Sequence, residues 1–323
     1  MPKGSKKKSD DDFFEESMEF FLEQGKNLSS KCSDIVDEYN DHSLLKLIAI
    51  AYWVGIFTPI CHKQLKEKFG YKVVYVDSMG GSGVTKTRRT GDCFCGSCTG
   101  AVLSANRKGF PFDKIIAVEI DSKKINALAS RLRQINPNLQ LSTYSNDILN
   151  VSKQIAQELA SKSVSYVVID PEGFQGMTWE SIGPLLDCKG DAMITWFEND
   201  AWRMKGAALS GGLNSDKISE RLTELLGSDD WKNTNDPIDL TNLFIQRVIN
   251  ETNKTAAECI DIEDIQGKHY KMILFAGKFR NAQTLVTEWK NHMERRLGSD
   301  KGKNIGRLLD RKAGRIADLR DFM

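Results

Sequence analysis

One segment constrains the fold of this chain more than any other. Residues 71–83 read Tyr-Lys-Val-Val-Tyr-Val-Asp-Ser-Met-Gly-Gly-Ser-Gly. The apolar, β-branched stretch predicts a buried strand, which ends in Asp77 and a glycine-rich turn containing Gly81 and Gly83. Glycines let the backbone turn sharply and approach a ligand closely. This order is typical of the first strand of a doubly wound α/β sheet that binds a nucleotide-like ligand at its carboxyl edge.

The rest of the chain alternates between strand and helix patterns. This alternation predicts an α/β fold with a doubly wound, mostly parallel sheet and helices on both faces. Besides the strand at 72–77, strands are predicted at 114–119, 139–144, 165–170, 191–197 and 270–276. Helices are predicted near 43–69, 98–108, 122–134, 150–161, 178–187, 215–226 and 280–296. Residues 227–265 are interpreted as helical, with a turn at Asn235-Asp-Pro237.

Composition divides the chain into three regions. Residues 1–41 begin with lysines and aspartates and continue with apolar residues over 13–22, which predicts a solvated tail and a docking helix. Residues 42–290 hold the predicted strands and form an α/β domain with a helical insertion at about 203–265. Residues 291–323 are rich in lysine and arginine and predict a basic helical tail.

Charge and cysteine content set limits on partners and location. The chain has 45 Lys and Arg residues against 44 Asp and Glu residues, so a nucleic-acid partner requires a local basic patch. The seven cysteines follow no extracellular pattern, which predicts a reduced, cytoplasmic setting. The charge-free run at 47–61 is short and contains Gly55 and Pro59, so we expect a buried core helix and no membrane association.

Four predicted strands end in acid-bearing segments, and ligands of open α/β sheets bind at that edge. The acids are Asp77, Glu119, Asp147 and Asp170. Their order fits a class I S-adenosylmethionine (SAM) site, in which the glycine turn approaches the methionine moiety. Glu119 would accept hydrogen bonds from the ribose hydroxyls, Asp147 from the adenine amino group, and Asp170 would face the methyl donor.

Other roles compete for the same residues. Acids after strands often cap the next helix, and Asp147 fits capping as well as cofactor contact. Glu119 lies in an apolar run where an unpaired charge is costly, which favours a ligand. The run from Gly80 to Thr87 differs from a P-loop at Thr85, where that motif needs glycine, so a P-loop-like NTPase is the alternative enzyme.

Several short motifs, taken in order, resemble the three-Cys-motif partner family over about residues 42–290. The matching runs are His42-Ser-Leu-Leu-Lys46, Tyr75-Val-Asp77-Ser-Met-Gly-Gly81-Ser-Gly83, Gly96-Ser97, Asp170-Pro-Glu-Gly173, Ile194-Thr-Trp-Phe197 with Arg203, and His269-Tyr-Lys-Met-Ile-Leu-Phe275-Ala-Gly-Lys278. The resemblance implies a SAM-methyltransferase-like Rossmann fold, with a doubly wound, mostly parallel, seven-stranded Rossmann-like sheet. Because the family is named for cysteines of a partner protein, it also implies a protein partner, and a non-catalytic partner subunit is the alternative to an enzyme.

The run Asp170-Pro171-Glu172-Gly173 also resembles motifs of enzymes that methylate exocyclic amines of bases. By this resemblance Asp170 and the Pro171 carbonyl would accept the amine N–H groups, and RNA or DNA would be the substrate. Glu172 replaces the aromatic residue usual at its position, with Phe174 as the substitute. Trp196 and Trp202 are further stacking candidates, and the basic residues for a large substrate are Arg88, Arg89, Arg107, Lys108 and those of the tail.

The segment from Thr85 to Cys95 departs from the family pattern. With the following helix start it places Cys93, Cys95 and Cys98 within six residues. Three thiolates this close bind zinc or an iron–sulfur cluster if a fourth ligand folds in, the candidates being Cys61, His62 and Cys188. The alternative is a reduced segment with one cysteine at a helix start.

Overall fold

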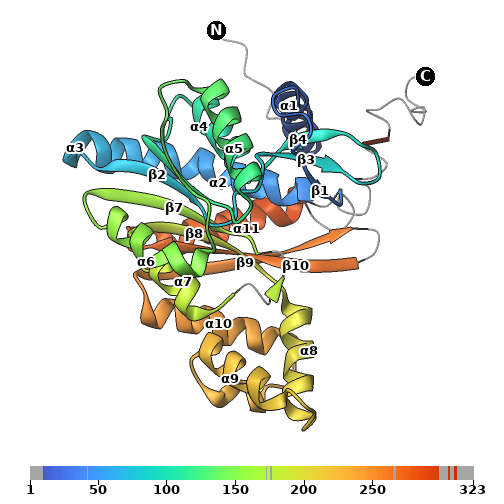
Figure 1. Cartoon of the computed structure of the whole chain (residues 1–323). Coiled ribbons are helices and arrows are strands. Elements are labelled where there is room, and N and C mark those ends of the chain that lie inside the picture. Colours follow the sequence, from blue (N-terminus) through green and yellow to red (C-terminus); the bar gives the residue numbers. More distant parts are fainter. Residues whose placement is uncertain are drawn as a thin grey trace.

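The computed structural model describes residues 10–41, 43–171, 173–174, 177–264, 267–297, 305 and 309–310. Its main feature is a seven-stranded sheet in the order β6-β5-β2-β7-β8-β10-β9 (Figure 1). In that order the strands are Gln140–Tyr144, Lys114–Val118, Lys72–Asp77, Ser163–Ile169, Gly190–Trp196, Gly267–Gly277 and Lys254–Asp264. The five strands from β6 to β8 pair in parallel, whereas β10 is antiparallel to both β8 and β9. The predicted doubly wound, mostly parallel, seven-stranded Rossmann-like sheet is confirmed.

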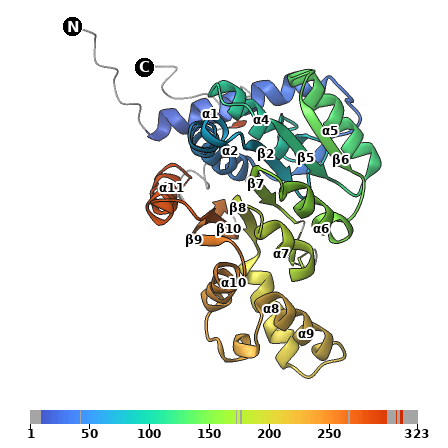
Figure 2. The same ribbon diagram turned by 90° about the vertical axis from the view of Figure 1, so that its left-hand side faces the viewer.

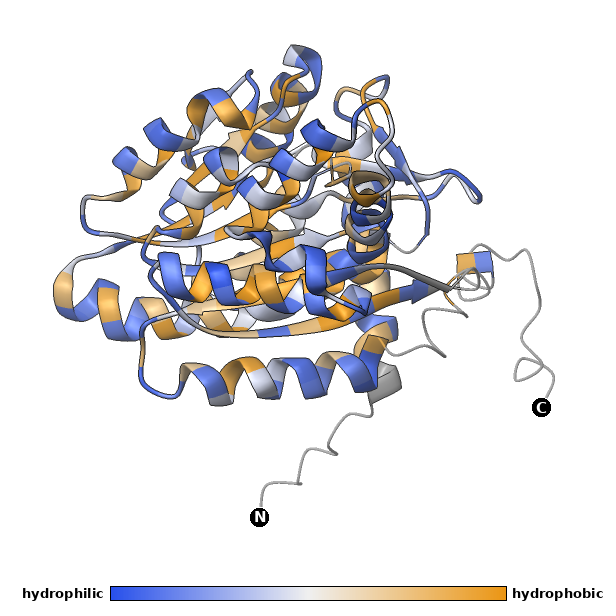
Figure 3. Ribbon diagram, turned by 90° about the horizontal axis from the view of Figure 1, so that it is seen from below, coloured by the Kyte–Doolittle hydropathy of each residue, from blue (hydrophilic) through white to orange (hydrophobic). Residues whose placement is uncertain are grey.

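The sheet separates two hydrophobic cores because successive side chains of a strand point to opposite faces. In β2, Val73 and Tyr75 belong to one core, and Val74 and Val76 belong to the other. Buried on both faces, such central strands are apolar throughout, and Figure 3 shows hydrophobic residues along them beneath helices of mixed colour. The apolar run at 72–77 therefore forms the centre of the sheet.

Helices cover both faces (Figure 2). The first core is covered by α1, α2, α4, α5 and α11, which span Asp10–Ser29, Ser43–Cys61, Ser97–Arg107, Ser122–Ile135 and Ala282–Leu297. The second core is covered by α6, α7, α8, α9 and α10, which span Ile148–Leu159, Trp179–Leu186, Glu198–Leu209, Ser215–Leu226 and Pro237–Glu251. Helices α8, α9 and α10 lie together on one side of the sheet, below it in Figure 1. Every helix predicted between residues 43 and 226 is present within a few residues.

Helix α2 is the central helix of the first core. Together with the π-helical turn His62–Lys66 and α3, Glu67–Phe69, it is long and apolar enough to cross a membrane by length and composition. Most of α2 is nevertheless buried in this fold, and its Trp53 Nε1 donates to Asp191 Oδ2 at 3.0 Å inside the protein. The predicted core helix is confirmed.

A second, three-stranded sheet lies above the glycine turn. It consists of β1, Asp37–Tyr39, β3, Val84–Thr87, and β4, Cys93–Cys95, in the order β1-β3-β4. The segment that departs from the family pattern is thus a β-hairpin. Helix α1 lies directly on it: a Cβ added to Gly25 would come within 2.2 Å of Phe94 Cα.

Two expectations about the C-terminal half need correction or fall outside the structure. Residues 254–264 are not helical but form the edge strand β9, which pairs with β10 and buries Ala256, Ile260 and Ile262. The alternating run Glu-Cys-Ile-Asp-Ile-Glu at 258–263 was a period-two signal that the helical interpretation missed. Helix α11 ends at Leu297, and most of the predicted basic tail lies outside the described residues.

The contact between α1 and β4 generates a stability prediction. We expect Gly25→Ala to lower the free energy of unfolding by about 1–3 kcal/mol, because its methyl group would overlap the Phe94 backbone. Gly206→Ala, in the exposed interior of α8 with open space around it, should instead raise that free energy by up to about 1 kcal/mol. Urea unfolding of both variants measures these changes. An equal change in the free energy of unfolding for both variants would contradict the packing of α1 on β4.

Candidate functional site

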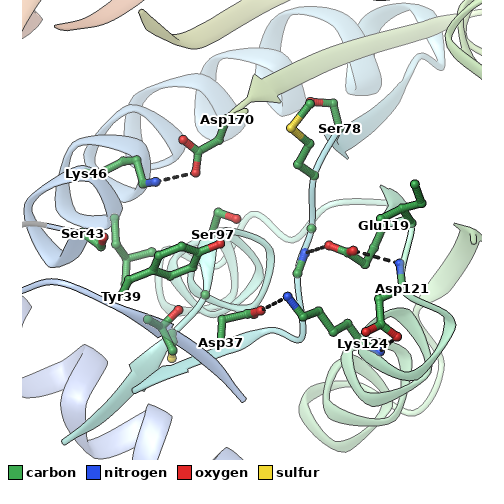
Figure 4. A pocket seen from close by; sticks show the side chains of 18 of the residues that line it. Asp37, Tyr39, Ser43, Lys46, Ser78, Ser97, Glu119, Asp121, Lys124 and Asp170 are labelled. Carbon is green, nitrogen blue, oxygen red and sulfur yellow. Dashed lines mark hydrogen bonds and ion pairs between the residues drawn. The ribbon is translucent and has the colours of Figure 1, made fainter. Parts of the chain in front are cut away.

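A cavity of about 440 Å³ lies at the carboxyl ends of the central parallel strands. The strand order reverses beside β2, with β5 on one side and β7 on the other, and open α/β sheets bind ligands at such a point. Figure 4 shows the side chains that converge there from both sheets and from α2. The volume of this cavity is within the range of about 300–1,000 Å³ usual for small-molecule sites.

Glu119 forms the wall of the cavity after β5. Its Oε2 accepts a hydrogen bond from the Gly81 amide at 3.1 Å, and its Oε1 accepts one from the Asp121 amide at 3.0 Å. Gly81 has φ +57°, a conformation that favours glycine, and a Cβ there would meet Asp37 Oδ2 at 2.6 Å. Gly81 and Glu119, both predicted from the sequence, therefore line the cavity. The Glu119 carboxylate keeps further acceptor positions for a ligand.

The wall after β6 combines polar edges with apolar surfaces. Asp147 lines the cavity and also caps α6, since its side chain accepts from the Leu149 amide at 2.9 Å. Helix capping and contact with a ligand, the two roles that the sequence leaves open for Asp147, are thus compatible. Ile120 and Ile148 line the same region, and Ile120 is 70% exposed although it is large and apolar. This combination suits a flat ring with polar groups at its edge.

Asp77 and Gly83 lie beneath the cavity and do not line it. Asp77 is fully buried and accepts hydrogen bonds from Ser97 Oγ at 2.7 Å and from the Tyr75 hydroxyl at 3.2 Å. Burial raises its pKa to about 6. A Cβ on Gly83 would meet Leu128 Cδ1 at 2.7 Å. Both residues support the turn from below, and their predicted contact with a cofactor stays a prediction.

Asp170 lies at the other end of the cavity and makes two polar contacts. Its Oδ2 is paired with Lys46 Nζ of α2, and its Oδ1 accepts from Thr195 Oγ1 at 2.7 Å (Figure 4 shows the pair). Both side chains of the pair are 17% exposed. The predicted aspartate is thus held in one orientation by groups from α2 and β8.

A second cavity of about 390 Å³ adjoins the first beyond this pair. Asp170 and Lys46 line both cavities, as do Asp37, Tyr39, Ser43 and Lys124, while Pro171 lines the second. The second cavity also has three aromatic residues and one arginine in its wall: Tyr39, Phe197, Tyr270 and Arg88.

Glu172 lies outside the described residues. The aromatic residues predicted to stack on a substrate are described, and they do not line either cavity. Phe174 and Trp196 are buried in the second core, where their rings meet edge to face at 5.4 Å, so neither is placed to stack on a substrate. Trp202 is partly buried against the same core.

The first cavity is negatively charged overall. Its wall carries the carboxylates of Asp37, Glu119, Asp121, Asp147 and Asp170, against the ammonium groups of Lys46 and Lys124. Lys124 is paired with Asp37 Oδ1 at 2.9 Å. A ligand with positive charge is therefore favoured over one with several phosphates.

The P-loop-like alternative lacks its geometry. A P-loop runs from a strand through the loop directly into a helix that begins at the lysine and threonine. Here Val84–Thr87 is the strand β3, and α4 begins only at Ser97. Lys86 therefore lies on the small sheet and not at a helix start.

Ser78 provides a polar group without a protein partner. It follows β2, lines the first cavity and is 1% exposed. Within the described part of the chain its Oγ has no hydrogen-bond partner. Since buried polar groups are nearly always paired, this hydroxyl indicates a site built to receive polar atoms.

The predicted metal site is not supported by the donor geometry. In the described ranges, no three His, Cys, Asp or Glu side chains group closely enough to hold a metal ion. Cys95 and Cys98 are buried in the first core, and burial raises the pKa of the Cys95 thiol to about 12 and that of Cys98 as well. Metal ligation requires thiolates, which these surroundings disfavour. The cysteines serve as small apolar packing groups.

Sequence reasoning missed Lys46, Asp37 and Lys124. Lys46 had a signal, because it is the only charged residue of α2. Asp37 had none: it lies in a short strand whose position over the glycine turn depends on pairing with β3. Its Oδ2 accepts from the Ser82 amide at 2.6 Å, which joins β1 to that turn.

Comparison with known proteins gives matches of structure alone. No family profile and no curated sequence matches the chain. Protein LPL1258 from Legionella pneumophila is 9% identical, with TM-score 0.46 over 80% of this chain and 93% of that one. A Klebsiella pneumoniae protein described as a candidate O-methyltransferase is 11% identical, with TM-score 0.40 over 81% and 90%.

An rRNA methylase from Streptococcus thermophilus is also 11% identical, with TM-score 0.35 over 68% of this chain and 95% of that one. Similarities this low concern the fold and say nothing of activity. The resemblance to the three-Cys-motif partner family stays a prediction.

The raised pKa of Asp77 predicts a pH dependence of stability. A carboxyl that binds its proton more tightly when folded stabilises the fold at low pH, and this contribution is lost as pH rises from about 4 through about 6. Asp77→Asn removes the titration. We expect the variant to gain up to about 3 kcal/mol in free energy of unfolding, relative to the wild type, between pH 4 and 7.5. Urea unfolding without ligand at several pH values measures this gain. A difference between variant and wild type that stays constant with pH would contradict the prediction.

Proposed function

We propose that this protein is a SAM-dependent methyltransferase. The observation that supports this most directly is the acid-lined cavity at the reversal point of the sheet, with the Glu119 carboxylate fixed beside the glycine turn. When bound, SAM supplies an electrophilic methyl group on a positively charged sulfur. A cation of this kind suits a cavity with five carboxylates and two lysines.

The residues of the cavity fit the parts of such a cofactor. Glu119 would accept hydrogen bonds from two adjacent ribose hydroxyls. Ile120 and Ile148 would contact the faces of the adenine ring, and Asp147 would accept from its amino group. The unpartnered Ser78 hydroxyl and the turn at Gly81 would meet the polar amino-acid end.

We further propose that the second cavity receives the methyl acceptor, an exocyclic amine of a nucleic-acid base. Asp170 lines both cavities and would accept an N–H of the amine, which directs the nitrogen lone pair toward the methyl group. Tyr39, Phe197 and Tyr270 offer aromatic surfaces for a base, and Arg88 offers a cation for a phosphate.

The cofactor proposal predicts a binding result. We expect calorimetric titration of the full chain to show micromolar SAM binding, and Glu119→Ala to weaken it at least about 100-fold by removing the paired acceptor. Glu180→Ala, an exposed acid paired with Lys153 on the outside of α7, is the matched control and should bind normally. ATP with magnesium serves as the parallel ligand, and its binding in place of SAM would overturn the proposal.

The acceptor proposal predicts a separate loss of chemistry. Asp170→Asn should reduce methyl transfer to RNA or DNA by at least about 100-fold while SAM binding stays within about tenfold. Transfer of labelled methyl groups to single-stranded and duplex oligonucleotides measures it. Affinity for the nucleic acid should fall steeply with added salt, whereas a flat response would point to a protein acceptor. Equal turnover by the variant would exclude Asp170 from the reaction.

A further inference from the structure

We propose that Lys46 is a specificity-determining residue of this site. Its ammonium group offsets the charge of Asp170 where the two cavities meet, and thereby sets how strongly the site prefers a positively charged cofactor over its neutral, demethylated product. The inference rests on the proposed function and assigns a role to a residue outside the predicted site.

The position of Lys46 is unusual for a lysine. Helix α2 contains no other charged residue, and the residues on either side of Lys46, Leu45 and Leu47, are buried. Long charged side chains in such a helix normally reach solvent, yet this one is 17% exposed and ends on Asp170. A charge is retained in the core helix only at the point where that helix borders both cavities.

The fold holds the lysine in place. The bond from Trp53 to Asp191 anchors α2 to β8, and the second oxygen of Asp191 accepts from the Gly277 amide at 2.9 Å. Thr195, in the same strand β8, donates to Asp170. One strand therefore anchors both the helix that carries Lys46 and the carboxylate that it meets. The Tyr270 ring lies 5.8 Å from Lys46 Nζ on the side of the second cavity.

The reaction moves a positive charge past this pair. The bond between sulfur and the methyl carbon breaks with its electrons remaining on sulfur, and the nitrogen lone pair forms the new bond to carbon. Positive charge thus passes from the first cavity to the second, and the nitrogen then gives a proton to the Asp170 carboxylate. Asp170 borders both cavities and stabilises the charge before and after transfer, while Lys46 limits how tightly the cationic form is held.

The test compares SAM with S-adenosylhomocysteine, which lacks the methyl group and the positive charge, and needs no acceptor. Calorimetry on the full chain gives both dissociation constants for the wild type and for Lys46→Met, Lys46→Arg and Asp170→Asn. We expect Lys46→Met to shift the preference toward SAM by about three- to tenfold, because Asp170 is left uncompensated. Asp170→Asn should shift the preference the opposite way, and Lys46→Arg should retain the wild-type ratio.

The control is Lys114→Met, which breaks a similar pair with Glu158 at the opposite edge of the sheet and should leave the ratio unchanged. A purely structural role for Lys46 would weaken both ligands equally, and that result would overturn the inference. If the wild type binds both ligands but the ratio is the same in all variants, the inference fails while the proposed function stands. If the wild type binds neither ligand, the proposed function itself fails.

Discussion

The candidate site depends on the carboxylate of Glu119, which joins two loops of the sheet edge. One oxygen binds the Gly81 amide after β2 and the other binds the Asp121 amide after β5. These loops are far apart in sequence, and a bond between them fixes the width of the cavity. Glu119, the residue proposed to bind a ribose, therefore also shapes the turn beside it, and the two are already joined without a ligand.

The turn is held from its other sides as well. Asp37 of β1 accepts from the Ser82 amide, and the fully buried Arg131 of α5 donates to the Ser82 carbonyl at 2.7 Å. Arg131 also donates to the carbonyls of Lys31 and Cys32, just after α1. The buried Arg131 cation is satisfied by these carbonyl oxygens, and the Asp37 carboxylate adds a favourable charge interaction. The N-terminal helix and the small sheet thus become structural supports of the cavity.

The two cavities share part of their wall and differ in charge. Five carboxylates and two lysines line the first, whereas the second has three carboxylates, two lysines and Arg88 beside its aromatic rings. Asp170 and Lys46 belong to the shared wall, where Asp37 and Lys124 form a second ion pair. Under the proposed function a methyl group would pass this shared wall, so the charge balance of the wall would affect binding, transfer and release.

The sequence by itself determined the sheet, most helices and the acids at the strand ends, because these depend on local periodicity and on turn residues such as Gly81. The alternating run at 258–263 carried a signal for β9, but the pairing of that strand with β10 and the small sheet formed by β1 and the hairpin depend on contacts between distant segments. Only the tertiary structure decided which acids face the cavity: Glu119, Asp147 and Asp170 do, whereas Asp77 is buried beneath it. It also brought Lys46 to Asp170 across 124 positions of sequence, since no local pattern encodes the packing of α2 on the sheet.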